Sequence, residues 1–308
     1  MKILFMGTPD FAVPCLEILI KNGHDVCGVV TQPDKPKGRG HKLVPPPVKA
    51  CAVENGISVY QPDSLRDKAL LPILEELEPE LIVVVAYGKI LPEYILNFPK
   101  YGCVNVHASL LPKYRGAAPI QWSVINGEKE TGVTTMYMEK GLDTGDMILK
   151  SVTQIGENET YGELHDRLSV MGAELLAKTI PEIEKGTAPR EKQEDALSNY
   201  APMISRETGK IEWNKSAEEI VNLIRGCNPY PGAYTMYKDE VLKIFSAVSG
   251  DKRSGECGSI KVASKKLEIV CGDGKCIIAD EIQFKGGKRM NVASYLNGHS
   301  IDENIILK

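Results

Sequence analysis

The stretch LIVVVA, residues 81–86, consists of consecutive aliphatic side chains. An apolar run without polar alternation is typical of a strand buried on both faces, as in a parallel sheet covered by helices. Similar runs precede and follow it, and segments with helical periodicity separate them. The expected strands cover residues 2–6, 26–30, 57–60, 81–86 and 104–108, and the expected helices cover 11–23 and 65–77. This alternation predicts an α/β fold with a mostly parallel sheet and helices on both faces.

The pattern changes after a long amphipathic segment at 164–184, which we expect to be a helix. Before it, apolar runs at 133–138 and 147–153 predict two further strands that pair as a hairpin. After it, residues 189–205 are polar and have little periodicity, which indicates a linker.

Residues 206–308 carry short strand-like runs separated by Gly, Asn and Asp. Many short strands at nearly regular spacing predict a small β-barrel or sandwich. A helical segment precedes these strands, and Ser216 and Glu219 have the spacing of a capping box at its start. We therefore expect an α/β domain at 1–188, a linker at 189–205 and a β domain at 206–308.

The composition is that of an ordinary globular protein of 308 residues, 43% hydrophobic and 25% charged, with a net charge of -4. No apolar run approaches the roughly 18 residues of a membrane span, and the N-terminal run is too short for a signal peptide, so we expect a cytoplasmic protein. The eight cysteines form no CxxC pair. Reduced thiols are a better interpretation than a zinc site at Cys257, Cys271 and Cys276, and we expect no metal.

Asn105 and His107 are polar residues near the end of an otherwise apolar run. Two positions apart on a strand, they share one face, while Val104 and Val106 occupy the other. Ligands bind at the carboxyl ends of the strands in open parallel sheets. Either the pair only satisfies local backbone groups, or both side chains are directed at a ligand, and the position at the strand end favours the second interpretation.

A glycine-containing segment at 139–146 connects the two strands of the expected hairpin. Asp143 or Asp146 could reach a histidine at a strand end, although Asp and Gly are also ordinary turn residues. An amide, an imidazole and a carboxylate without a plausible Ser or Cys nucleophile indicate direct group transfer. The amide would donate to a developing oxyanion, the imidazole would move protons, and the carboxylate would orient the imidazole.

Residues 31–49 (TQPDKPKGRGHKLVPPPVK) contain five Lys or Arg residues and one Asp, and they are rich in proline. We expect a long basic loop rather than a regular helix. A solvated excursion is one interpretation, but loops of this length in compact domains usually bind or cover something. The charge favours phosphates, including those of a nucleic acid.

The first strand is followed by MGTPDF, residues 6–11, which lacks the G-x-G-x-x-G fingerprint of dinucleotide-binding folds. A nicotinamide cofactor therefore has weak support. Thr8 is as well placed to cap the following helix as to bind a ligand, with Pro9 at the first helical position.

Together these pieces resemble the methionyl-tRNA formyltransferase family over nearly the whole chain. The motifs that carry the resemblance are MGTPDF at 6–11, QPD at 32–34 with GRG at 38–40, AYG at 86–88, NVHASLLP at 105–112, Arg115-Gly116 and LDTGD at 142–146. The Asn, His and Asp set is shared by enzymes that move formyl groups from 10-formyltetrahydrofolate, so it indicates the chemistry and not the acceptor. The basic loop and the small β domain point to tRNA.

The resemblance implies a Rossmann-like formyltransferase domain followed by a small OB-like β-barrel domain. It implies transfer of a formyl group from 10-formyltetrahydrofolate to the α-amine of initiator methionyl-tRNA, through a tetrahedral oxyanion, for translation initiation. The implied catalytic residues are Asn105, His107 and Asp143; the implied folate-site residues are Ser109, Leu110, Leu111, Pro112, Ala86 and Tyr87; and the implied tRNA-binding residues are Arg39, Lys37, Lys42, Arg206 and Lys210. We expect a monomer.

Three alternatives remain open at this point. A formyltransferase acting on an amino sugar nucleotide or glycinamide ribonucleotide would share Asn105, His107 and Asp143 but would not need the basic loop. A non-catalytic tRNA-binding protein with a relic folate pocket is disfavoured by the complete set of three residues. A nucleotide-dependent oxidoreductase is disfavoured by the missing glycine fingerprint.

Overall fold

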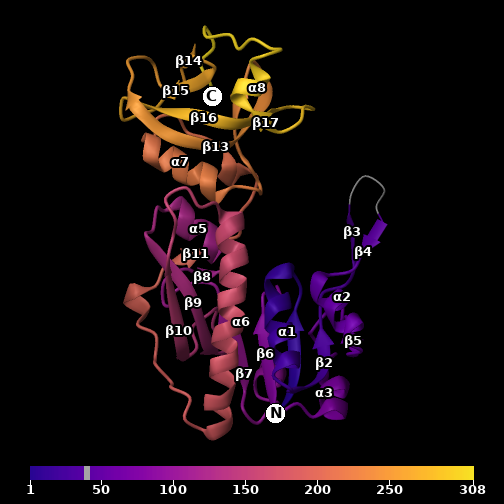
Figure 1. Cartoon of the computed structure of the whole chain (residues 1–308). Coiled ribbons are helices and arrows are strands. Elements are labelled where there is room, and N and C mark those ends of the chain that lie inside the picture. Colours follow the sequence, from indigo (N-terminus) through magenta and orange to yellow (C-terminus); the bar gives the residue numbers. More distant parts are fainter. Residues whose placement is uncertain (38–41) are drawn as a thin grey trace. The chain divides into compact units, whose positions relative to one another are not determined.

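The computed structural model describes residues 1–37 and 42–308, which divide into two compact units (Figure 1). The first unit comprises Met1–Pro119, Glu130–Thr153 and His165–Ala201, and the second comprises Ile120–Lys129, Gln154–Leu164 and Pro202–Lys308. The division of the chain at 1–188, 189–205 and 206–308 remains our prediction. No helix among the described residues is long and apolar enough to cross a membrane.

Within the described residues, seven strands of the first unit form one sheet in the order β10-β9-β7-β6-β1-β2-β5. They are β1 Lys2–Gly7, β2 Asp25–Val30, β5 Val59–Tyr60, β6 Leu81–Val85, β7 Cys103–His107, β9 Glu130–Tyr137 and β10 Met147–Gln154. The first five run parallel, and β9 is antiparallel to β7. The expected α/β class with a mostly parallel sheet is confirmed, as are the neighbouring strands β9 and β10.

The helices of this part cover the sheet, and Figure 1 shows α1 and α6 side by side. The helical segments of the first unit are η1 Asp10–Ala12, α1 Val13–Lys21, α2 Pro47–Glu54, α3 Leu71–Leu77, α4 Glu93–Leu96, η2 Asp195–Leu197 and α6 Tyr161–Lys185 from His165 onward, whereas α5 Pro119–Ile125 belongs to the second unit except for its first residue. A Cβ on Gly172 of α6 would come within 3.0 Å of Val106 Cγ1, so α6 packs closely on this face of β7. Asn105 and His107 therefore occupy the face of β7 that is turned away from α6.

The helix expected at 65–77 begins later, at Leu71. Asp67 and Lys68 adopt φ values of 54° and 56°, which no helix tolerates. Pro72 explains the difference, because its ring disfavours helical backbone before it and it is accepted only in the first turn.

On either side of residues 38–41, the expected loop at 31–49 has more regular structure than predicted. It contains two short paired strands, β3 Lys35–Lys37 and β4 Lys42–Val44, and its last residues begin α2. Lys49 Nζ donates to both carboxylate oxygens of Asp34 at 2.9 Å and to Gln61 at 2.7 Å. The hydrogen bonds from Lys49 and Gln61 lower the pKa of Asp34. The Lys49 ammonium group is thus engaged in hydrogen bonds within the protein.

The second unit is built on an antiparallel sheet with the order β12-β13-β16-β15-β14, and β17 pairs with β16. The strands are β12 Ala233–Tyr237, β13 Glu240–Lys252, β14 Ile260–Ala263, β15 Lys266–Val270, β16 Lys275–Phe284 and β17 Met290–Asn291, accompanied by η3 Glu207–Gly209, α7 Ala217–Gly226 and α8 Val292–Tyr295. Ser216 Oγ accepts from Glu219 N, and Glu219 Oε2 accepts from Ser216 N, so the predicted capping box is confirmed.

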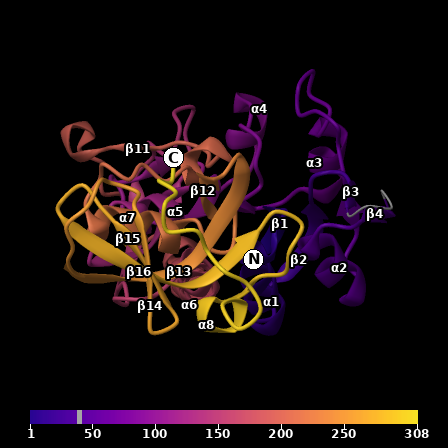
Figure 2. The same cartoon turned by 90° about the horizontal axis from the view of Figure 1, so that it is seen from above.

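The last residues of the chain connect the two edges of this sheet. Lys308 exchanges backbone hydrogen bonds with Met236 of β12, and Leu307 N donates to Gly258 O, just before β14, at 3.0 Å. Figure 2 shows the C-terminal end beside β12. These hydrogen bonds cover part of both edges of the sheet, and uncovered edge strands tend to pair with other chains. The arrangement is that of the expected OB-like β domain.

Two tyrosines, Tyr87 in the core and the partly buried Tyr94, permit a test of the packing in the first unit. Tyr87 is 2% exposed and its hydroxyl has no hydrogen-bond partner among the described residues, whereas Tyr94 Oη donates to Leu65 O and accepts from Leu70 N. Burial raises the pKa of Tyr87 to about 12. We expect Tyr87→Phe to leave the free energy of unfolding unchanged or raised, because no hydrogen bond is lost.

Tyr94→Phe removes two hydrogen bonds that fix the irregular 65–70 segment, and we expect a loss of about 1–2 kcal/mol. Urea titrations of the two variants check the contrast. Equal destabilisation by both substitutions would contradict this description of the core.

Candidate active site

Strand β7 presents Asn105 and His107 on one face, opposite Met136 and Thr134 of β9. Both side chains are buried, with 9% and 6% exposure. No described residue makes a hydrogen bond to the Asn105 amide. The Asn105 amide is not among the described polar groups that are both cut off from solvent and without a partner, so a ligand can reach it and accept its hydrogen bonds.

His107 is held through its ring nitrogen Nε2, which lies 2.9 Å from the carbonyl oxygen of Tyr114. A carbonyl only accepts, so Nε2 carries a proton and donates it. The other ring nitrogen, Nδ1, lies 3.8 Å from Asp143 Oδ2. The atom of His107 that can gain or lose a proton is therefore Nδ1, beside a carboxylate.

Asp143 is the acidic residue that the structure brings to His107. Its Oδ2 accepts a hydrogen bond from Gly116 N at 2.8 Å. Its φ of 52° is left-handed, a conformation that non-glycine residues seldom adopt. Asp146 instead lies 3.7 Å from Arg190 Nη1. Of the two candidates that the sequence leaves open, Asp143 faces the histidine.

The predicted folate-site segment 109–112 is a buttressed turn. Ser109 Oγ donates to Lys113 O at 2.6 Å, and Thr134 Oγ1 donates to Ser109 O at 2.7 Å while accepting from Leu111 N. Ser109 and Leu111 are buried, whereas Leu110 and Pro112 are partly exposed. Ser109 and Leu111 therefore shape the turn, and Leu110 and Pro112 are available for contact with a ligand.

Ala86 and Tyr87 follow β6 at the same edge of the sheet. Ala86 is exposed with a left-handed φ of 46°, but the ring of Tyr87 lies in the core. The Tyr87 carbonyl accepts from Thr8 Oγ1 at 3.2 Å and from Gln32 Nε2 at 3.0 Å. The capping interpretation of Thr8 is wrong, because Pro9 is the cap residue and no side chain caps η1.

Of the five predicted tRNA-binding residues, the structure describes the side chains of two. Arg39 lies outside the described residues. Lys37 ends β3 and Lys42 begins β4, but their side chains are not described. Arg206 and Lys210 are exposed and flank η3.

Three residues near the site were missed by sequence reasoning. They are Thr134, which holds the 109–112 turn, and Gln193 and Asn199, which hydrogen-bond to the Asp143 loop and to Tyr114. Thr134 resembles an ordinary strand residue, and the other two lie in a polar stretch that reads as a linker. No local signal identifies them, because their partners are distant in the chain.

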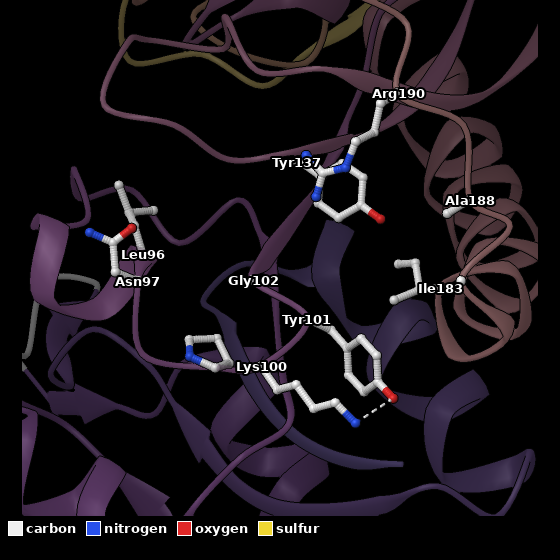
Figure 3. Close-up of a pocket in the computed structure, with 11 residues that line it drawn as sticks. Leu96, Asn97, Lys100, Tyr101, Gly102, Tyr137, Ile183, Ala188 and Arg190 are labelled. Carbon is white, nitrogen blue, oxygen red and sulfur yellow. Dashed lines mark hydrogen bonds between the residues drawn. The ribbon is translucent and has the colours of Figure 1, made fainter.

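A cavity of about 480 Å³ lies elsewhere in the first unit (Figure 3). Lys100, Tyr101, Tyr137 and Arg190 are among the residues that line it. Gly102, at its wall, precedes the first residue of β7, while Asn105 and His107 lie toward the end of that strand. The cavity is thus not the candidate site. All eight cysteines are free thiols, and no described group of three or more His, Cys, Asp or Glu residues could hold a metal ion.

Comparisons with known proteins show which family the chain resembles. A model of the Formyl transferase family matches residues 1–180, and a model of the Formyl transferase, C-terminal domain, matches residues 203–300. The methionyl-tRNA formyltransferase of Clostridioides difficile is 52% identical over the full length of both chains. That of Alkaliphilus oremlandii is 53% identical and covers 100% of this chain and 99% of its own.

Solved structures share the fold at lower identity. The N-formyltransferase of Helicobacter canadensis, solved with folinic acid and dTDP-3-aminofucose, superposes with a TM-score of 0.67 at 24% identity and covers 91% of this chain and 98% of its own. The methionyl-tRNA formyltransferase of Clostridium thermocellum gives a TM-score of 0.57 at 19% identity, with coverages of 92% and 98%.

Two adjacent threonines of β9 allow the 109–112 turn to be tested. Thr134→Val removes both hydrogen bonds to the turn, so we expect a severalfold higher Kd for 10-formyltetrahydrofolate, the ligand that the motifs imply. Thr135→Val is the matched control, because Thr135 is equally buried but pairs with Thr179 and Leu149. Each substitution should cost about 1–3 kcal/mol of stability. Fluorescence titration that finds the same Kd for both variants would contradict the role given to Thr134.

Proposed function

This chain belongs to the methionyl-tRNA formyltransferase family, and we propose that it transfers the formyl group of 10-formyltetrahydrofolate to the α-amine of initiator methionyl-tRNA, which supplies formylmethionyl-tRNA for translation initiation. The observation that carries the proposal is the Asn105 amide, free of protein partners and open to a ligand, beside the His107–Asp143 pair, in a chain more than 50% identical to such enzymes. We expect it to act as a monomer in the cytoplasm, where tRNA is charged.

The residues at the end of β7 fit a formyl donor. The Asn105 side chain has two N–H groups without protein partners, and a carbonyl oxygen is the acceptor they require. Leu110, Pro112 and Ala86 are partly or fully exposed and offer apolar contact. The formyl donor, 10-formyltetrahydrofolate, supplies an activated formyl group attached to nitrogen.

The acceptor needs little activation. The α-amine of an aminoacyl ester has a reference pKa of about 7.7–8.0 for an α-amino group, so a substantial fraction is neutral near pH 7. Its nitrogen attacks the formyl carbon, a new carbon–nitrogen bond forms, and the carbonyl oxygen becomes an oxyanion. Asn105 donates to this oxygen where the negative charge develops.

His107 and Asp143 serve the proton transfers. With Nε2 donating to Tyr114 O, His107 exchanges a proton at Nδ1, and Asp143 stabilises the charge of the protonated ring. The tetrahedral oxyanion then collapses, the bond to the folate nitrogen breaks, and that nitrogen receives the proton lost by the amine. Atoms and charge balance without any further reactant.

Substitution of the two strand residues should separate turnover from binding. Asn105→Ala should lower kcat about 10²–10³-fold, because one oxyanion donor is lost, with KM for either substrate changed only a few-fold. His107→Ala should lower kcat about 10²–10⁴-fold. Asn97→Ala, at an exposed position beside the cavity of Figure 3, is the control. Near-normal turnover of either site variant would reject these roles.

The acceptor is tested by formyl transfer from 10-formyltetrahydrofolate to initiator methionyl-tRNA. Charged elongator tRNA and amino sugar nucleotides run in parallel. Transfer to the initiator alone supports the proposal. Turnover on a small amine, with none on tRNA, would keep the chemistry of the site and overturn the acceptor.

We propose that the basic residues Arg39, Lys37, Lys42, Arg206 and Lys210 contact tRNA. Arg39→Ala should raise KM for charged tRNA and reduce the salt dependence of log(kcat/KM) by about 1, as expected for one lost phosphate contact. Arg66→Ala, an exposed arginine outside this set, should change neither. An unchanged salt slope in Arg39→Ala would count against the contact.

A further inference from the structure

The segment 190–201 lies along the first unit and is anchored where it begins. The Arg190 guanidinium lies over the Tyr137 ring (Figure 3), and the distance to the centre of the ring is 3.8 Å. Glu191 exchanges two backbone hydrogen bonds with Met147 at 2.8 and 3.0 Å. A stretch that reads as a linker is thus fixed to β9 and β10, the strands on either side of the Asp143 loop.

Gln193 contacts this loop with the nitrogen of its side-chain amide and Arg115 with the oxygen. Its Nε2 donates to the carbonyl oxygens of Asp143 and Gly145, both at 2.8 Å. Its Oε1 accepts from Arg115 Nε at 3.0 Å. Because Asp143 has a left-handed backbone, its conformation persists only where neighbouring groups hold it, and Gln193 holds its carbonyl.

The end of segment 190–201 contacts residues 114–116, which form hydrogen bonds with His107 and Asp143. Asn199 accepts from Tyr114 N through its side chain and from Arg115 N through its carbonyl. The short strand β11 Tyr200–Ala201 then pairs with β8 Arg115–Gly116. These contacts fix residues 114–116, and this stretch carries the carbonyl that accepts from His107 and the amide that donates to Asp143.

We propose that segment 190–201 is a positioning element for catalysis and that Gln193 is its central residue. Gln193 contacts neither the reacting atoms nor His107, so it acts through Asp143. Without its two donors, the Asp143 backbone is free to leave the left-handed region, and the carboxylate turns away from Nδ1 of His107. This inference rests on the proposed function, because its readout is formyl transfer.

Two substitutions separate the hydrogen bonds of Gln193. Gln193→Met is similar in size and neutral but removes the donors and the acceptor. Gln193→Glu keeps an acceptor for Arg115 and loses only the donors to the loop. We expect both to lower kcat at least tenfold with KM for both substrates within threefold of wild type. Wild-type kcat in either variant would overturn the inference.

Gln283→Met is the matched control, since Gln283 also donates its amide to a carbonyl, that of Gly287, at 3.0 Å in the second unit. It should leave kcat unchanged. If it lowers kcat as much as Gln193→Met does, the loss at Gln193 is not specific to the Asp143 loop, and the inference fails.

A double-mutant cycle distinguishes positioning from a general structural effect. If Gln193 acts through Asp143, then Gln193→Met should lower the kcat of the Asp143→Ala enzyme by less than twofold. A multiplicative loss in the double variant would overturn the inference. Thermal unfolding of all variants shows whether each is folded at the assay temperature. If the wild-type chain forms no formylmethionyl-tRNA, the proposed function itself fails, an outcome distinct from an active wild type with unaffected variants.

Discussion

The hydrogen bond from His107 Nε2 to the Tyr114 carbonyl is the constraint on which the site depends. It assigns the ring proton to one nitrogen and turns the other toward Asp143. That orientation requires the backbone after Pro112 to return over the end of β7. The turn at 109–112 makes this return possible, and Thr134 holds it in place.

The site is thus built from backbone groups as much as from side chains. A carbonyl holds His107, an amide holds Asp143, and the amide of Gln193 holds the loop behind Asp143. Only Asn105 has no described protein partner. In the proposed reaction, this division leaves the Asn105 amide available to donate to the developing negative charge.

Several predictions from the sequence succeeded because they rest on local periodicity. The buried run predicted at 81–86, which forms β6 at 81–85, the shared face of Asn105 and His107, and the capping box at Ser216 all follow from spacing within a few residues. The helix expected at 65–77 failed at its start, since Pro72 and two left-handed residues oppose it. Thr8 failed as a cap because the helical turn begins one residue later, with Pro9 as its cap residue, and Thr8 Oγ1 accepts instead from Gln32 N.

The sequence by itself determined the α/β class, the polar pair at the end of β7 and the motifs that indicate formyl transfer, because each depends only on the order and periodicity of nearby residues. Only the tertiary structure decided that Asp143 rather than Asp146 faces His107, and that Gln193 and Asn199 belong to the site. The physical reason is distance along the chain: Gln193 meets the Asp143 carbonyl across 50 positions and Asn199 meets Tyr114 across 85, and only the folded sheet brings such pairs within hydrogen-bonding distance.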